Sequence, residues 1–153
     1  MNLKSLLNQP STRILKWVAV GFLVVGFWGF LDASYLAAKY YSGEPITCSL
    51  LEGCEQVTTS EYAAIFGVPV ALLGAAYYLF IFLAAIYYFD SKNARVFKRI
   101  APITAAAFLA TLYFVYLQLF VIGAICIYCM FSALTSTILF GLGIITVRLE
   151  KHD

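Results

Sequence analysis

The chain has 153 residues, of which 63% are hydrophobic and only 12% are charged, and its formal net charge is +2. Soluble domains carry about 25% charged residues, so this composition excludes an ordinary soluble globular domain. A core of this size cannot hide so much apolar surface from water. We therefore expect an integral membrane protein whose surroundings are lipid, with no nucleic-acid partner.

Uncharged runs mark the expected membrane spans. The run Tyr62–Phe89 has 28 residues and would measure roughly 42 Å as a helix, enough to cross a bilayer with some tilt. The run Ile100–Val147 has 48 residues, and a single helix of about 72 Å would be too long. It must form a hairpin that breaks near residues 121–124, at Gly123. The sequence predicts one all-α domain, 1–153, a bundle of four transmembrane helices at about 14–38, 62–89, 100–122 and 125–147.

Basic residues are distributed unevenly between the segments that connect these spans. Nine of the ten Lys and Arg residues lie in the N-terminal flank, the loop 90–99 and the C-terminal tail, and Lys39 lies on the opposite side. Cytoplasmic segments carry the excess of Lys and Arg. We therefore expect both termini in the cytoplasm, the loop 39–61 on the outer face, and a multi-pass protein of the inner (plasma) membrane.

The four cysteines form two close pairs that this topology brings to the outer, extracytoplasmic face. Cys48 and Cys54 lie in the outer loop, while Cys126 and Cys129 open the last span as a Cys-x-x-Cys motif. Disulfides persist in compartments outside the cytoplasm. Three interpretations stay open at this point: two structural disulfides, a zinc or iron–sulfur site, and a thiol–disulfide relay without a metal.

The settings of the two pairs favour the relay. A pair in a loop that contains Gly43, Pro45 and Gly53 can reach a soluble protein. Cys126 and Cys129 are three residues apart at a helix start, so they share one face of that helix. A helix N-terminus favours the thiolate form of cysteine. This pair is therefore suited to react with a molecule that resides in the lipid.

The ordered set of these motifs resembles one family. The segment Cys54–Pro69, CEQVTTSEYAAIFGVP, together with the Cys-x-x-Cys that opens the fourth span, is similar to the vitamin K epoxide reductase family in its bacterial and archaeal form. The resemblance extends from the first span to about Val147. It implies a four-helix bundle around a quinone of the ubiquinone or menaquinone class, which is reduced while a disulfide is made for a thioredoxin-like partner.

The resemblance also implies roles for individual residues. Cys48 would exchange with the partner protein, Cys54 would pass electrons to Cys126, and Cys129 would face the quinone ring. Ser60 matches a serine placed near that ring. Because the chain stops at Asp153, without the fused thioredoxin domain of many bacterial members, we expect a separate partner on the extracytoplasmic side.

Two departures from the animal members concern the substrate. Ala63 and Ala133 occupy positions at which animal members place an Asn and a Tyr that bind the vitamin K headgroup. Their absence argues against the alternative reaction, quinone-epoxide reduction, and favours a simpler quinone oxidant. A non-enzymatic membrane protein with structural disulfides is the other alternative.

Further residues have both a structural and a functional interpretation. Phe66 is one of several aromatic residues near the outer face that are expected to line a flat quinone. Thr58 and Glu61 fit a capping box before the second span, and Pro69 is expected to kink that span. Asp32 is embedded in the first span, where either a proton path to the reduced quinone or simple satisfaction by water and backbone explains it.

Overall fold

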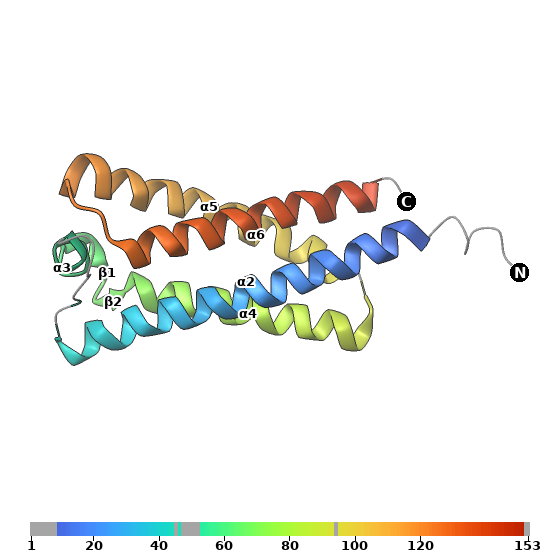
Figure 1. Ribbon diagram of the computed structural model, residues 1–153, viewed down its shortest axis with the longest axis horizontal. Coiled ribbons are helices and arrows are strands. Elements are labelled where there is room, and N and C mark those ends of the chain that lie inside the picture. Colours follow the sequence, from blue (N-terminus) through green and yellow to red (C-terminus); the bar gives the residue numbers. More distant parts are fainter. Residues whose placement is uncertain (1–8, 45, 47–52, 94, 152–153) are drawn as a thin grey trace, which may run out of the picture.

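Four long helices dominate the computed structural model, which describes residues 9–44, 46, 53–93 and 95–151 (Figure 1). Each contains an apolar segment long enough to cross a membrane. The prediction of an all-α bundle of four transmembrane helices is therefore confirmed. The helices are α2 (Gln9–Ser42), α4 (Val70–Ser91), α5 (Arg95–Tyr116), which continues as a π-helix (Leu117–Ile122), and α6 (Ile127–Lys151).

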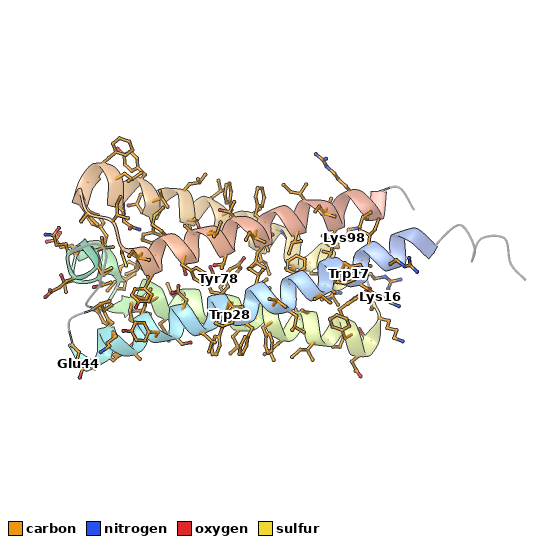
Figure 2. All side chains as sticks on the ribbon, viewed as in Figure 1. Lys16, Trp17, Trp28, Glu44, Tyr78 and Lys98 are labelled. Atoms are coloured by element: carbon orange, nitrogen blue, oxygen red, sulfur yellow. The ribbon has the colours of Figure 1, made fainter. Side chains whose placement is uncertain are left out.

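The two ends of the bundle differ in what they carry. The ends of the described chain lie together at one end of the bundle, which we call the terminal end (Figure 1). The labelled Lys16 and Lys98 lie toward this end, and Glu44 lies at the opposite end, which we call the outer end (Figure 2). The outer end also carries the short helix α3 (Gly53–Thr58) and a two-stranded hairpin. The two ends of the described chain thus share one side, as predicted, and the compartment that each end of the bundle faces stays a prediction.

The second span begins later than the sequence suggested. Helix α4 starts at Val70 rather than near Tyr62, and Pro69 precedes its first residue instead of kinking its interior. Residues before it form a 3₁₀ turn (Glu61–Ala63) and an antiparallel hairpin of β1 (Ala64–Ile65) and β2 (Val68–Pro69). Phe66 and Gly67 make the tight turn with φ angles of 52° and 80°, as two-residue hairpin turns require.

The expected capping box at Thr58 and Glu61 does not form, because Thr58 ends helix α3 instead of starting the second span. Its hydroxyl donates to the backbone carbonyl of Cys54 at 2.8 Å. Hydroxyl side chains bond to the carbonyl four residues back when they lie inside or at the end of a helix. The polar stretch therefore closes α3 and turns the chain toward the hairpin.

The terminal half of the bundle has a tightly packed core. Helices α2 and α4 approach so closely that a Cβ atom on Gly29 would overlap the ring of Tyr78. Small residues permit such close approach of membrane helices, whose packing supplies much of their association energy. The core of this half consists of large, fully buried side chains from all four long helices, namely Phe22, Ile81, Phe97, Ile100 and Leu139.

Candidate active site

The Cys-x-x-Cys pair lies where the chain turns from α5 into α6. Residues 123–126, which we call the link, join the π-helix to α6, and Gly123 adopts φ of 70° to reverse the chain. The Cys126 carbonyl accepts the first helical hydrogen bond, from the backbone N–H of Met130 at 3.0 Å. Cys126 is therefore the N-cap of α6, and Cys129 lies in its first turn.

The position of Cys126 favours the thiolate form of its sulfur. The Cys129 thiol and the backbone N–H groups of Cys129 and Tyr128 donate to it, and together they lower the pKa of Cys126 to about 7, although burial acts in the opposite direction. Donors to a sulfur at a helix N-terminus favour the thiolate, which is the nucleophilic form. Cys126 can therefore act as the nucleophile that attacks a disulfide and as the leaving group when a disulfide that contains it is attacked.

The loop pair reaches this site through Cys54. Cys54 is disulfide-bonded, and Cys48 lies outside the described residues. Cys126 and Cys129 are both free thiols. Cys54 and Cys126 are almost completely buried in one cluster that also contains Leu36, Val57 and Ala124. A disulfide sulfur and a lowered-pKa thiol therefore share the same apolar environment at the outer end.

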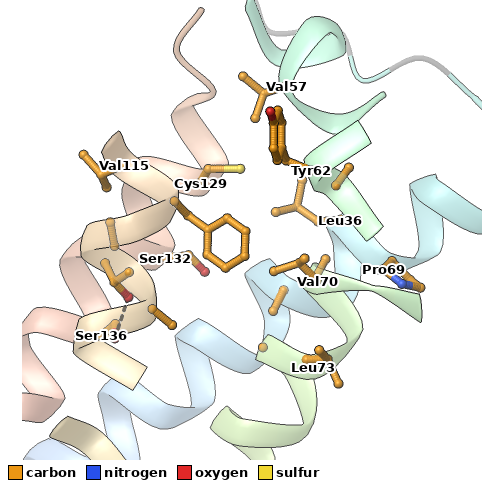
Figure 3. Close-up of a pocket in the computed structure, with 18 of the residues that line it drawn as sticks. Leu36, Val57, Tyr62, Pro69, Val70, Leu73, Val115, Cys129, Ser132 and Ser136 are labelled. Atoms are coloured by element: carbon orange, nitrogen blue, oxygen red, sulfur yellow. Dashed lines mark hydrogen bonds between the residues drawn. The ribbon is translucent and has the colours of Figure 1, made fainter. Parts of the chain in front are cut away.

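A cavity of about 510 Å³ opens inside the outer half of the bundle, beside Cys129. Figure 3 shows Cys129 and Ser132 on one wall, across from Leu36, Tyr62 and Val70. All four long helices, α3 and the hairpin contribute to its lining. Its lining residues Leu73 and Ile103 are also exposed on the lipid-facing surface of α4 and α5, so the cavity reaches the membrane side of the bundle.

The other residues that the sequence predicted to bind the quinone differ in where the structure places them. Ser60 lines the cavity, and its hydroxyl donates to the Val57 carbonyl at 2.7 Å. Phe66 is not one of the lining residues, because it forms the hairpin turn and its side chain is fully exposed. Ala63 and Ala133 both line the cavity, so the positions that differ from the animal members do face this space.

Two lining residues escaped the sequence reasoning. Gln118 is 4% exposed, and its Oε1 accepts from the backbone N–H of Cys126 at 3.1 Å. Tyr77 has a buried hydroxyl without a hydrogen-bond partner among the described residues. The signal for Gln118 was available, because it is the amide in an uncharged run of 48 residues. Polar side chains inside membrane spans are costly and usually have a specific partner.

Asp32 lies near the cysteines rather than in the cavity wall. It is half-buried, its Oδ2 atom has no hydrogen-bond partner among the described residues, and its charge acts on Cys126. The structure thus places this acid beside the redox pair, and its role stays a prediction. Within the described part of the chain, no group of three or more His, Cys, Asp or Glu side chains is placed to hold a metal ion.

The family model for the vitamin K epoxide reductase family matches residues 20–144 of this chain. The match begins in α2 and ends in α6, so it includes all four cysteines of the sequence and every residue that lines the cavity. The chain therefore belongs to the vitamin K epoxide reductase family, and the family resemblance drawn from the cysteine motifs is confirmed.

A curated relative gives a more specific comparison. The chain is 31% identical over 131 residues to "Thiol-disulfide oxidoreductase LTO1" of Arabidopsis thaliana, and the match covers 79% of this chain and 34% of that protein. The chain thus spans about a third of the length of the relative that it matches. The printed name describes that plant protein as a thiol–disulfide oxidoreductase.

Proposed function

We propose that this protein is a membrane thiol–disulfide oxidoreductase that makes disulfides at the expense of a quinone. It takes two electrons from the thiols of a thioredoxin-like protein and passes them through Cys48 and Cys54, then Cys126 and Cys129, to a quinone of the ubiquinone or menaquinone class. The observation that carries this proposal is the position of the Cys-x-x-Cys pair. Cys126 shares a buried cluster with disulfide-bonded Cys54, while Cys129 faces the cavity.

The cavity fits a quinone in size and chemistry. Ligand pockets have volumes of about 300–1,000 Å³ and are mostly apolar with a few polar groups, and this one measures about 510 Å³. Leu36, Val70 and Leu73 would contact the ring and its tail, while Gln118 and Ser132 offer hydrogen-bonding groups. When bound, the quinone would supply the two-electron oxidising power that the protein itself lacks.

Exchange between the two pairs proceeds by thiolate attack on a disulfide. With Cys126 and Cys129 oxidised, the Cys54 thiolate attacks the Cys126 sulfur, a Cys54–Cys126 bond forms, and Cys129 leaves as the thiolate. The Cys48 thiolate then attacks the Cys54 sulfur, which restores the loop disulfide and releases Cys126. The lowered pKa of Cys126 makes it a good leaving group in this second step. The state in which Cys54 is disulfide-bonded and Cys126 and Cys129 are free thiols follows this step.

The packing of the outer end keeps Cys54 and Cys126 away from bulk water. Cys126 is 0% exposed and Cys54 is 1% exposed. Water exclusion strengthens the hydrogen bonds that the Cys126 sulfur accepts and limits side reactions of the thiolate. The protein therefore contributes proximity, a helix-terminus field and shielding.

The test is quinone reduction by purified protein in detergent, with a dithiol as the electron source and a short-chain ubiquinone and menaquinone as acceptors. We expect wild-type turnover with at least one quinone, and a loss on the order of 10³-fold or more in Cys129→Ala, because the residue that meets the quinone is gone. Thr137→Ala is the matched control, because Thr137 lies on the same helix as Cys129, is exposed, and is not one of the cavity-lining residues. A wild type that reduces neither quinone, or a Cys129→Ala variant that retains turnover, would contradict the proposal.

The proposed side of the membrane has its own test. We place the cysteines on the extracytoplasmic face and the partner in that compartment, because nine of the ten basic residues lie in the segments at the other end. In intact cells, a membrane-impermeant thiol reagent should modify a cysteine introduced in place of Glu44 and should not modify one introduced in place of Ser91. If only the Ser91→Cys variant is labelled, the proposed orientation in the membrane is wrong and the opposite one holds.

A further inference from the structure

The glycine that precedes Cys54 lies against the link that precedes Cys126. A Cβ atom built on Gly53 would be 2.8 Å from both the backbone N and the backbone O of Ile125, and 3.2 Å from the Ala124 side chain. Real Cβ atoms do not approach backbone atoms this closely. Helix α3 therefore sits directly on the link, with no side chain between the two backbones, and only glycine permits this approach.

Glycine is needed at position 53 because there is no space for a side chain, and not because the backbone there has an unusual conformation. Gly43, Gly67 and Gly123 have φ values of 66° to 80°, whereas Gly53 has no positive φ and begins α3 with helical geometry. Alanine is intrinsically favoured over glycine in a helix. An alanine at position 53 would therefore be tolerated by α3 itself, and its cost would arise at the contact with the link.

The link is held rigidly from its other side by Gln118. The Gln118 backbone carbonyl accepts from the N–H groups of Gly123 and of Ala124, the latter at 3.1 Å. Its side-chain Oε1 accepts from Cys126 N–H, and because that partner is a donor, the oxygen must face it. Gln118 lies in the π-helix, an irregularity that is frequent at functional sites. The link therefore cannot easily retreat from a larger side chain at position 53.

We propose that Gly53 is a positioning residue for electron transfer between the two cysteine pairs. Its missing side chain lets α3 dock on a link that Gln118 holds in place, and this docked state brings the Cys54 sulfur to the Cys126 sulfur. The proposal rests on the relay described under Proposed function. It adds that the rate of exchange between Cys54 and Cys126 is set by how closely α3 approaches residues 124–125.

The proposal predicts that larger side chains at position 53 slow the exchange more. With Gly53→Ala, α3 or the link must shift by several tenths of an ångström, and with Gly53→Val by more. A misplacement of about 1 Å between reacting groups can slow a reaction about a hundredfold. We expect the exchange rate to fall about tenfold with Gly53→Ala and about a hundredfold with Gly53→Val.

Single-turnover exchange in the full-length protein tests this inference without any quinone. In a Cys129→Ser background, the Cys126 thiolate attacks the Cys54 disulfide, a Cys54–Cys126 bond forms, and the other cysteine of that bond is released as a thiol. Two electrons stay within the protein, so no outside oxidant is needed. Mass-tagging of the released thiol against time, followed by non-reducing electrophoresis and peptide mapping, gives the rate.

Gly141→Ala is the matched control, because this glycine also lies in a helix and a Cβ atom there meets nothing within 4 Å. It should exchange at the rate of the Cys129→Ser parent. In chains that keep Cys129, oxidation of the Cys126–Cys129 pair by quinone should proceed at the wild-type rate in Gly53→Ala. A merely structural effect of Gly53 would slow both half-reactions together.

The outcomes separate this inference from the proposed function. If the parent forms the Cys54–Cys126 bond and Gly53→Val forms it equally fast, the positioning role is wrong and the relay stands. If the parent never forms this bond, the relay itself is wrong and the role of Gly53 falls with it. Slowing of Gly53→Ala and Gly53→Val with intact oxidation by quinone supports the inference.

Discussion

The terminal half and the outer half of the bundle consist of the same four helices, yet one half is filled and the other is hollow. At the terminal end, Phe22 stacks on Phe97 with ring centroids 5.3 Å apart, and the surrounding aliphatic residues are fully buried. At the outer end, the same helices surround a cavity of about 510 Å³. The difference shows that hydrophobicity alone does not determine whether a membrane bundle closes.

Side-chain volume accounts for this difference. Helix α5 contributes Ala106, Ala107 and Ala110 to the cavity wall, and α4 contributes Ala71 and Gly74. At the terminal end, α5 instead contributes Phe97 and Ile100 to the core. Lipid tails are as apolar as these side chains, so helices associate through packing rather than through exclusion of water. Where small residues face one another across the bundle, space remains for a ligand.

The same substitution at the two ends should therefore have opposite consequences. Ala107→Phe puts a ring into the cavity, and we expect quinone turnover to fall about a hundredfold or more while the melting temperature stays near that of the wild type. Ala85 is 0% exposed in the terminal core, and Ala85→Phe should destabilise the fold by about 1–3 kcal/mol through overpacking. Turnover and thermal unfolding in detergent, measured on both variants, check this contrast.

Destabilisation by Ala107→Phe equal to that by Ala85→Phe would contradict the comparison, because it would mean that the outer half is packed as tightly as the terminal half. Retained turnover in well-folded Ala107→Phe would show that the quinone binds elsewhere.

The number of spans and the break between the last two helices could be predicted from the sequence, because composition determines them. Uncharged runs of known length give the number of spans, and Gly123 marks the break between the last two helices. The outer end could not be predicted in the same way. The apolar stretch before Val70 is a hairpin, and an apolar run of this kind does not distinguish a short strand from a helix. Gly67 and Pro69 carried the turn signal there.

The sequence identified the two cysteines beside the cavity, and it did not identify the residue that holds the link in place. Cys126 and Cys129 were identified from their spacing and their place at a helix start, and the structure places them between Cys54 and the cavity. Gln118 was not identified, because its partner is a backbone N–H eight residues away in a link whose shape depends on a π-helix. The lone amide in an uncharged run indicates that Gln118 needs a polar partner, but the sequence does not tell which backbone group that partner is.

The reactivity of Cys126 should depend on its neighbour at the cavity. The Cys129 thiol is the main donor that lowers the pKa of Cys126 to about 7, so the thiolate is present above that pH and is lost as the pH falls below it. Cys129→Ala removes the donor and should raise this pKa, whereas Cys129→Ser keeps a hydroxyl donor. Each unit of pKa increase lowers the thiolate fraction below the midpoint about tenfold.

The pH dependence of the alkylation rate shows this most clearly when Cys126 is the single thiol, in a background with Cys48→Ser and Cys54→Ser. The profile of the Cys129→Ala variant should lie at higher pH than that of the Cys129→Ser variant. Coincident profiles would mean that the helix N-terminus alone sets the reactivity of Cys126.

Two adjacent tyrosines at the boundary between the halves offer the smallest and most closely matched contrast. The Tyr78 hydroxyl donates to the Ser132 carbonyl at 2.8 Å and lies 2.8 Å from the Thr135 hydroxyl, so it ties α4 to α6. The Tyr77 hydroxyl is buried without a partner among the described residues. Tyr78→Phe should cost about 0.6–1.7 kcal/mol, the range for hydrogen bonds between membrane helices. Tyr77→Phe should be neutral or slightly stabilising, since removing an unsatisfied buried hydroxyl removes its desolvation cost.

Thermal unfolding of the two variants in the same detergent measures this difference, because both substitutions remove one hydroxyl from the same helix. An equal loss of stability in both would mean that Tyr77 has a partner of its own in the folded protein. If added quinone stabilises the wild type more than Tyr77→Phe, that partner is the ligand in the cavity, and the unsatisfied hydroxyl marks the hollow half as a binding site rather than a packing defect.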